Sequence, residues 1–144
     1  MPIYESEYQH GLAQEDKVLP VIRSFFHRDI IKLPERFAKH DYECADYTYE
    51  LKSRRVRKES FPDTIIGSDK VMNLSKPLIL LFNFTDRLCY CEYDPIVFDE
   101  YKKELFGRLD RPVDEAKIHI HIPIDCLIDI CDWTRSGVAE QDSC

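Results

Sequence analysis

The sequence lacks an apolar run long enough to cross a bilayer. Its longest, residues 77–82, has the length of a buried strand. Residues 1–7 have neither a basic start nor an apolar stretch, so we expect no secretion signal. These absences favour a cytoplasmic protein that has no membrane partner.

Glycine is also scarce, with four in 144 residues, and there is no internal repeat and no Gly/Ser linker. This length suits one ordinary domain and leaves little room for a second. We therefore expect a single domain over residues 1–144, with its core at about 12–133 and looser ends.

The six cysteines include no Cys-x-x-Cys pair. Cys89 and Cys91 lie two positions apart in an apolar, aromatic segment, where a reduced cysteine packs as a small hydrophobic side chain. Structural zinc sites usually bring closely spaced ligand pairs. We therefore expect free thiols that bind no zinc.

An excess of positive charge is absent as well: 27 acidic residues outnumber 20 basic ones, and the net charge is −7. This balance argues against a protein whose whole surface coats nucleic acid. One basic run does occur, formed by Lys52, Arg54, Arg55, Arg57 and Lys58. Such a run is usually a solvated loop or strand end, but it can also form a local phosphate-binding patch.

Apolar spacing predicts alternating helices and strands. The helices are expected at residues 15–26, 69–74, 96–109 and 124–131. The strands are expected at residues 36–42, 47–56, 61–67, 77–84, 88–93 and 118–122. This order predicts an α/β (α+β) protein in which helices flank a mixed central sheet.

The strands at 36–42 and 47–56 should form a hairpin. If Tyr42 lies opposite Tyr47, Asp41 lies opposite Thr48, and Glu50 follows at a two-residue step on the same face. Lys52 shares that face. Two close carboxylates repel each other unless a hard divalent cation lies between them, so the pattern is compatible with a magnesium site.

Asp41 followed by Glu50-Leu51-Lys52 resembles the metal-binding signature of the PD-(D/E)xK nuclease superfamily, which has the restriction-endonuclease-like fold. The neighbouring elements are similar too, with Glu15 on the preceding helix and Lys70 after the strand at 61–67. The resemblance covers residues 15–94, and it is to a compact subgroup known from large DNA viruses and phages.

This resemblance implies a nuclease that uses Mg2+ or Mn2+ to cleave DNA. Asp41 and Glu50 would hold the metal, Lys52 would activate water, and Glu15 would complete the acidic site. It also implies a location in the host cytoplasm or the virion, and a homodimer or partner protein. The basic side chains expected to contact DNA are Arg54, Arg55, Arg57, Lys58 and Lys70.

Several alternatives remain open. Asp41 follows His40 rather than the proline of the signature, and Asp46 competes for its place. Glu50 and Lys52 fit an ordinary exposed strand pair, and Glu15 fits a helix N-terminus. His119 and His121, which share a strand face, are another candidate metal pair. A non-catalytic member of the same fold would act as a nucleic-acid-binding, virion or protein-interaction component.

Overall fold

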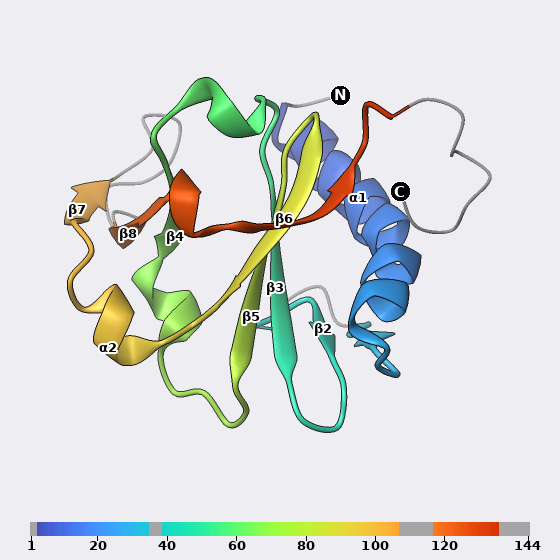
Figure 1. Cartoon of the computed structure of the whole chain (residues 1–144), viewed down its shortest axis with the longest axis horizontal. Helices are drawn as coiled ribbons and strands as arrows, with labels where there is room; N and C mark the ends of the chain where they lie inside the picture. Colours follow the sequence, from blue (N-terminus) through green and yellow to red (C-terminus); the bar gives the residue numbers. More distant parts are fainter. Residues whose placement is uncertain (1–2, 35–38, 107–116, 136–144) are drawn as a thin grey trace.

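The computed structural model describes residues 3–34, 39–106 and 117–135 (Figure 1). Its helices are α1 (Ile3–Phe26) and the short α2 (Pro95–Phe98), with 3-10 turns η1 (Lys58–Ser60), η2 (Ser68–Val71) and η4 (Ile124–Cys126). Its strands are β1 (Ile31–Lys32), β2 (Tyr42–Glu43), β3 (Thr48–Ser53), β4 (Asp63–Gly67), β5 (Leu78–Asn83), β6 (Arg87–Glu92), β7 (Lys103–Phe106), β8 (Lys117–Pro123) and β9 (Ile128–Asp132).

The strands form two sheets. The larger one has six strands in the order β1-β2-β3-β5-β6-β9, and the smaller has three in the order β4-β8-β7. In the larger sheet β3 and β5 run parallel, whereas the other neighbours are antiparallel. The α+β class with a mixed central sheet is therefore confirmed.

A hydrophobic core lies on each face of the six-stranded sheet. On one face, α1 contributes Val18 and Ile22, which pack with Ile79 and Leu81 of β5. On the other face, alternate residues of β5 pack against the small sheet; these are Leu78, Leu80 and Phe82. Because both faces are covered, β5 is apolar at successive positions rather than at every second one. Figure 1 shows α1 and the small sheet on opposite sides of the central strands.

The helix α1 begins at Ile3, well before the expected start at Glu15. The residues that precede Glu15 include good helix formers such as Leu12, Ala13 and Gln14, and nothing among them breaks a helix strongly. Pro20 lies inside α1 rather than at its start. The apolar stripe thus locates the buried part of the helix and not its beginning.

Two expected helices are largely wrong. Within 96–109 only α2 is helical; β7 follows, and residues 107–109 lie outside the described part. Within 124–131 the turn η4 leads into β9. Both strands have an antiparallel partner, with Leu105 opposite Ile118 and Cys131 opposite Leu88, and these pairings prevail over the helical spacing.

The β5–β6 hairpin, β4 and β8 are confirmed near their expected positions. Of the expected strand at 36–42, residues 36–38 lie outside the described part, and β2 begins at Tyr42. Cys44, Cys89, Cys91 and Cys126 are free thiols, as expected. Cys131 is disulfide-bonded, so the expectation of a free thiol is wrong for this residue.

None of the helices in the described residues is both long and apolar enough to span a membrane.

Candidate active site

The pairing of β2 with β3 brings Asp41 beside Glu50. Tyr42 lies opposite Tyr49, not opposite Tyr47 as the sequence suggested. The N–H of Asp41 donates to the carbonyl of Tyr49 at 3.0 Å, and its Oδ2 accepts from the N–H of Leu51 at 2.8 Å. The carboxylate of Asp41 thus continues the ladder along the edge of β3, at the end of β2 where the regular pairing stops.

Glu50 is a buried carboxylate, with 3% of its surface exposed. Its chain neighbours Tyr49 and Leu51 pack in the core beneath α1, so Glu50 projects to the opposite face of β3. Its Oε2 lies 3.3 Å from Lys52 Nζ and 3.7 Å from Lys70 Nζ. Its Oε1 is buried and has no hydrogen-bond partner among the described residues. The two oxygens of this carboxylate therefore have very different surroundings.

Glu15 approaches the same strand edge from α1. The hydroxyl of Tyr42 donates to the backbone carbonyl of Glu15 at 2.7 Å, which fixes this turn of the helix over β2. Lys32 Nζ lies 3.6 Å from Glu15 Oε1. Asp41 thus lies at the sheet edge between two glutamates, with Glu15 on the helix side and Glu50 on the small-sheet side.

The electrostatics reflect this crowding. Burial, together with repulsion from Asp41, raises the pKa of Glu50 to about 7, although Lys52 and Lys70 act in the opposite direction. Burial likewise raises the pKa of Glu15 to about 7, helped by repulsion from Asp41 and by a hydrogen bond shared between the two carboxyls. Asp41 therefore raises the pKa of both glutamates through like-charge repulsion.

Because these raised pKa values favour protonated glutamates in the folded chain, ionisation should destabilise it. The folded state binds protons more tightly than the unfolded state between the ordinary pKa of 4.5 and about 7, so this contribution to the free energy of unfolding falls as pH rises through that range. Burial lowers the pKa of His40, and this has the opposite effect over part of the same range.

Asp41→Asn isolates the acidic contribution, since its side-chain oxygen can still accept from Leu51 while the charge is lost. We expect the free energy of unfolding of the variant, relative to that of wild type, to increase by on the order of 1–2 kcal/mol between about pH 5 and about pH 8. Urea unfolding at both pH values measures this difference. A difference that shrinks as pH rises would contradict the arrangement of the three acids.

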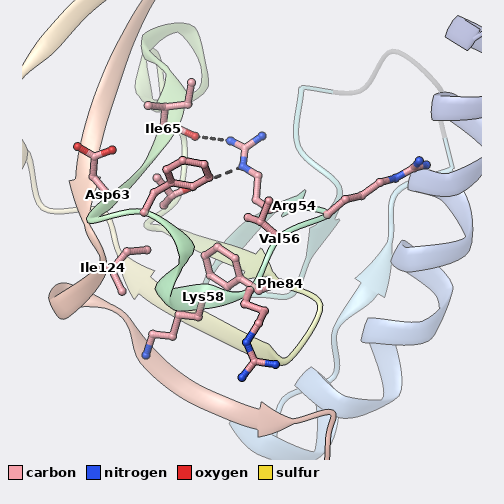
Figure 2. Close-up of a pocket in the computed structure, with 11 residues that line it drawn as sticks. Arg54, Val56, Lys58, Asp63, Ile65, Phe84 and Ile124 are labelled. Atoms are coloured by element: carbon pink, nitrogen blue, oxygen red, sulfur yellow. Dashed lines mark hydrogen bonds between the residues drawn. The ribbon is translucent and has the colours of Figure 1, made fainter.

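The basic residues divide into two groups. Arg54 donates to the carbonyl of Ile65 and, at 3.4 Å, to Thr64 Oγ1, and Lys58 Nζ pairs with Asp129 at 2.7 Å. Figure 2 shows Arg54 directed at β4. Intramolecular contacts thus occupy these two cations, which the sequence had assigned to DNA.

The remaining basic side chains are better placed to contact a phosphate group. Arg57 is largely exposed and lies 3.5 Å from Asp86, and Arg55 is exposed. Lys70, brought in by η2, also donates to the backbone carbonyl of Lys39 at 2.9 Å. Lys52 and Lys70 therefore reach the acidic site directly, and Arg55 reaches the adjoining cavity.

That cavity, of about 380 Å3, opens beside Glu15. Leu51 and Ser53 of β3 line it with Arg55, and His10 lines it from α1. It thus has acidic and basic groups on its wall, which suits a phosphate held close to a carboxylate site. No sequence pattern pointed to His10 or Lys32, because the spacing of single polar residues does not reveal which ones the fold brings to Glu15.

The other metal candidates are weaker. Within the described ranges no group of three or more His, Cys, Asp or Glu side chains has the arrangement of a metal site. His121 lies between two carboxylates, at 3.1 Å from Asp63 and 2.8 Å from Glu104. Asp46 is exposed in the turn between β2 and β3. Asp41 and Glu50 remain a carboxylate pair, and magnesium often takes only one or two carboxylates, with substrate phosphate and water completing its shell.

No family model matches the chain, and no match was found among curated proteins or solved structures. The likeness to PD-(D/E)xK nucleases rests on the residues themselves.

Proposed function

We propose that this chain is a divalent-metal-dependent nuclease that hydrolyses phosphodiester bonds in DNA. The observation that carries the proposal is Glu50: a buried carboxylate with one unpartnered oxygen, beside Asp41 and within ion-pair distance of Lys52 and Lys70. Asp41 and Glu50 would hold Mg2+ or Mn2+, and the bound ion would supply Lewis acidity toward phosphate and water.

The free-energy cost of burying Glu50 with one unpartnered oxygen supports the presence of a bound ligand. A buried polar atom without a hydrogen bond is uncommon in folded proteins, and each instance asks for an explanation. For stability alone, an apolar residue at position 50 would serve as well or better. A cation that completes the coordination of Glu50 Oε1 would explain why a carboxylate is present there.

The lysines have complementary roles in this proposal. Lys52 Nζ, which lies 3.3 Å from Glu50 Oε2 and is partly exposed, would orient the attacking water and take part in its activation. Lys70 Nζ lies 3.7 Å from the same oxygen and would offset negative charge that develops on the phosphate. Glu15 would complete the acidic surroundings from α1.

The distribution of charge favours binding through one cleft. The chain carries a net charge of −7, yet Lys52 and Lys70 lie beside Glu50, and Arg55 lines the cavity next to Glu15. Phosphate contacts of this kind position a strand without reading its sequence. Binding should therefore weaken steeply as salt is added.

We expect the purified chain to cut plasmid or single-stranded DNA with Mg2+ or Mn2+ and not with EDTA. Lys52→Ala should slow this cleavage about 100-fold, because a positioned proton-transfer group typically contributes that much. Lys102→Ala, which removes a mostly exposed lysine paired with Glu104, is the matched control and should leave the rate unchanged. Equal rates for Lys52→Ala and wild type would remove Lys52 from the mechanism.

A second candidate is a non-catalytic nucleic-acid-binding, virion or protein-interaction component. It is favoured by the two lysines, which already neutralise Glu50 within the chain. DNA binding without cleavage in either metal would support it. In either role we propose a cytoplasmic or virion setting, in which a homodimer or partner protein extends the small DNA-binding surface.

A further inference from the structure

A second cavity, of about 300 Å3, lies on the other side of the basic segment (Figure 2). It opens between residues 54–58, which follow β3, and the strand β4. The surface of its wall is mostly apolar and comes from Val56, Phe61, Ile65, Phe84 and Ile124, while the other lining side chains are polar or charged and include the carboxylate of Asp63. Its volume is at the lower end of the range for small-molecule sites.

The wall of this cavity is held in place by the surrounding fold. The N–H of Arg54 donates to the carbonyl of Asn83 at 2.8 Å, and the N–H of Thr85 donates to that of Val56 at 3.0 Å. The N–H of Lys58 donates to Asp86 Oδ1 at 2.8 Å. A preformed wall of this kind lowers the entropic cost of binding a ligand.

Phe61 distinguishes the cavity from a packing defect. It is 60% exposed and belongs to neither hydrophobic core, whereas Phe84 behind it is buried. The rim beside these rings is cationic, with Arg55 and Arg57 both exposed. An exposed aromatic ring above an apolar floor, bordered by guanidinium groups, is complementary to a flat aromatic ligand that carries negative charge.

Two arginines join this cavity to the candidate active site. Arg54 and Arg55 line both the apolar cavity and the cavity that contains Glu15. A strand that extends from the acidic site along β3 to Arg55 would therefore bring a base to the mouth of the apolar cavity, because Arg55 lines both cavities. The exposed guanidinium of Arg55 at this mouth favours an anionic nucleotide over an apolar peptide as the occupant.

We propose that the cavity bounded by Phe61 and Phe84 binds one nucleobase of a single-stranded nucleic acid. The inference rests on the proposed function, because it adds a base site to the same substrate strand. A paired base is stacked in its duplex and has to be unstacked before it enters a pocket. The chain should thus prefer single strands or frayed ends over a closed duplex.

The test is a thermodynamic cycle measured in EDTA, where no cleavage occurs. Short single-stranded DNA and a set of strands with one abasic nucleotide at successive positions are titrated against wild type, Phe61→Ala and Phe61→Tyr. Loss of one aromatic–base stack should weaken binding by about 5- to 150-fold. Phe61→Tyr should retain the affinity, because its ring still stacks.

At one position, removing the base should weaken wild type but have little further effect on Phe61→Ala, since both changes delete the same contact. Ile96→Ala is the matched control, because Ile96 is also a strongly exposed apolar residue and lies on α2, away from the cavity. It should bind like wild type.

The outcomes separate the two proposals. Coupling between Phe61 and one base, without cleavage in Mg2+ or Mn2+, would support the base site and overturn the nuclease. Cleavage without such coupling would overturn the base site and leave the nuclease standing. A fully abasic strand that binds as tightly as normal DNA, or no binding of single strands at all, would also overturn the base site.

Discussion

Glu50→Gln should abolish metal-dependent cleavage and at the same time make the chain more stable. Glutamine keeps the size of glutamate but lacks the negative charge that a divalent cation needs, so we expect a loss of rate of about 100-fold or more. Glutamine is also neutral at every pH, like the protonated glutamate that the folded chain favours.

The size of the stabilisation follows from the pKa of Glu50. Burial, with help from Asp41, raises it from 4.5 to about 7. Near pH 8, wild type carries the full cost of ionisation, so Glu50→Gln should have a free energy of unfolding about 3 kcal/mol higher. Near pH 4 the glutamate is protonated in both the folded and the unfolded state to a large extent, and the difference should nearly disappear.

Urea unfolding at the two pH values, together with cleavage assays of the same preparations, measures both effects. Gain of stability with loss of cleavage is the signature of a residue kept for function at the expense of stability. A variant that cleaves like wild type would assign the activity to another site or a contaminant. A variant that is less stable at every pH would mean that Glu50 has a structural role.

Although Arg54 and Arg55 are adjacent, Arg54→Ala should mainly lower stability, whereas Arg55→Ala should mainly weaken DNA binding. The guanidinium of Arg54 is bonded to Ile65 and Thr64 of β4, and burial lowers its pKa. Its removal leaves a strand carbonyl without its partner, so the free energy of unfolding should fall by about 2–3 kcal/mol.

Arg55 is exposed, so Arg55→Ala should change stability by less than about 0.5 kcal/mol. It should instead weaken DNA binding and reduce the slope of log affinity against log salt by about 1, the loss of one phosphate contact. Chemical unfolding and fluorescence anisotropy across a salt series measure the pair. A stable Arg54→Ala that loses DNA affinity would restore the original assignment of Arg54.

The sequence located the acidic site although it misjudged the hairpin. The turn closes through a hydrogen bond from the N–H of Cys44 to the carbonyl of Tyr47, and no glycine, proline or asparagine in it indicates that length. The resulting register differs by two positions from the expected one. Because side chains alternate with a period of two, a shift of two leaves Asp41 beside the face that carries Glu50 and Lys52.

The sequence predictions failed at positions where neither side-chain alternation nor helical periodicity indicates the structure. β3 ends at Ser53, so spacing did not indicate that Arg54 turns inward and Arg55 outward. Among the described strands, β7 and β9 are edge strands, each paired on one side. Each has an exposed apolar residue, Leu105 in β7 and Ile128 in β9, and apolar residues at such positions fit helical spacing as well as strand alternation. Long-range pairing decided these segments, and a local pattern contains no information about distant partners.

The parallel pairing of β3 with β5 has a consequence for how the chain folds. Thr48 meets Leu78 and Ser53 meets Asn83, so this pair forms only after the long crossover between them has closed, whereas the β5–β6 hairpin is local. Closing a long loop costs chain entropy before any contact repays it, which makes such pairings slow. Lys70 lies on that crossover, so its ion pair with Glu50 forms only when the slow step is complete. A partly folded chain in which β3 has not yet paired with β5 would therefore lack both the burial of Glu50 and its contact with Lys70.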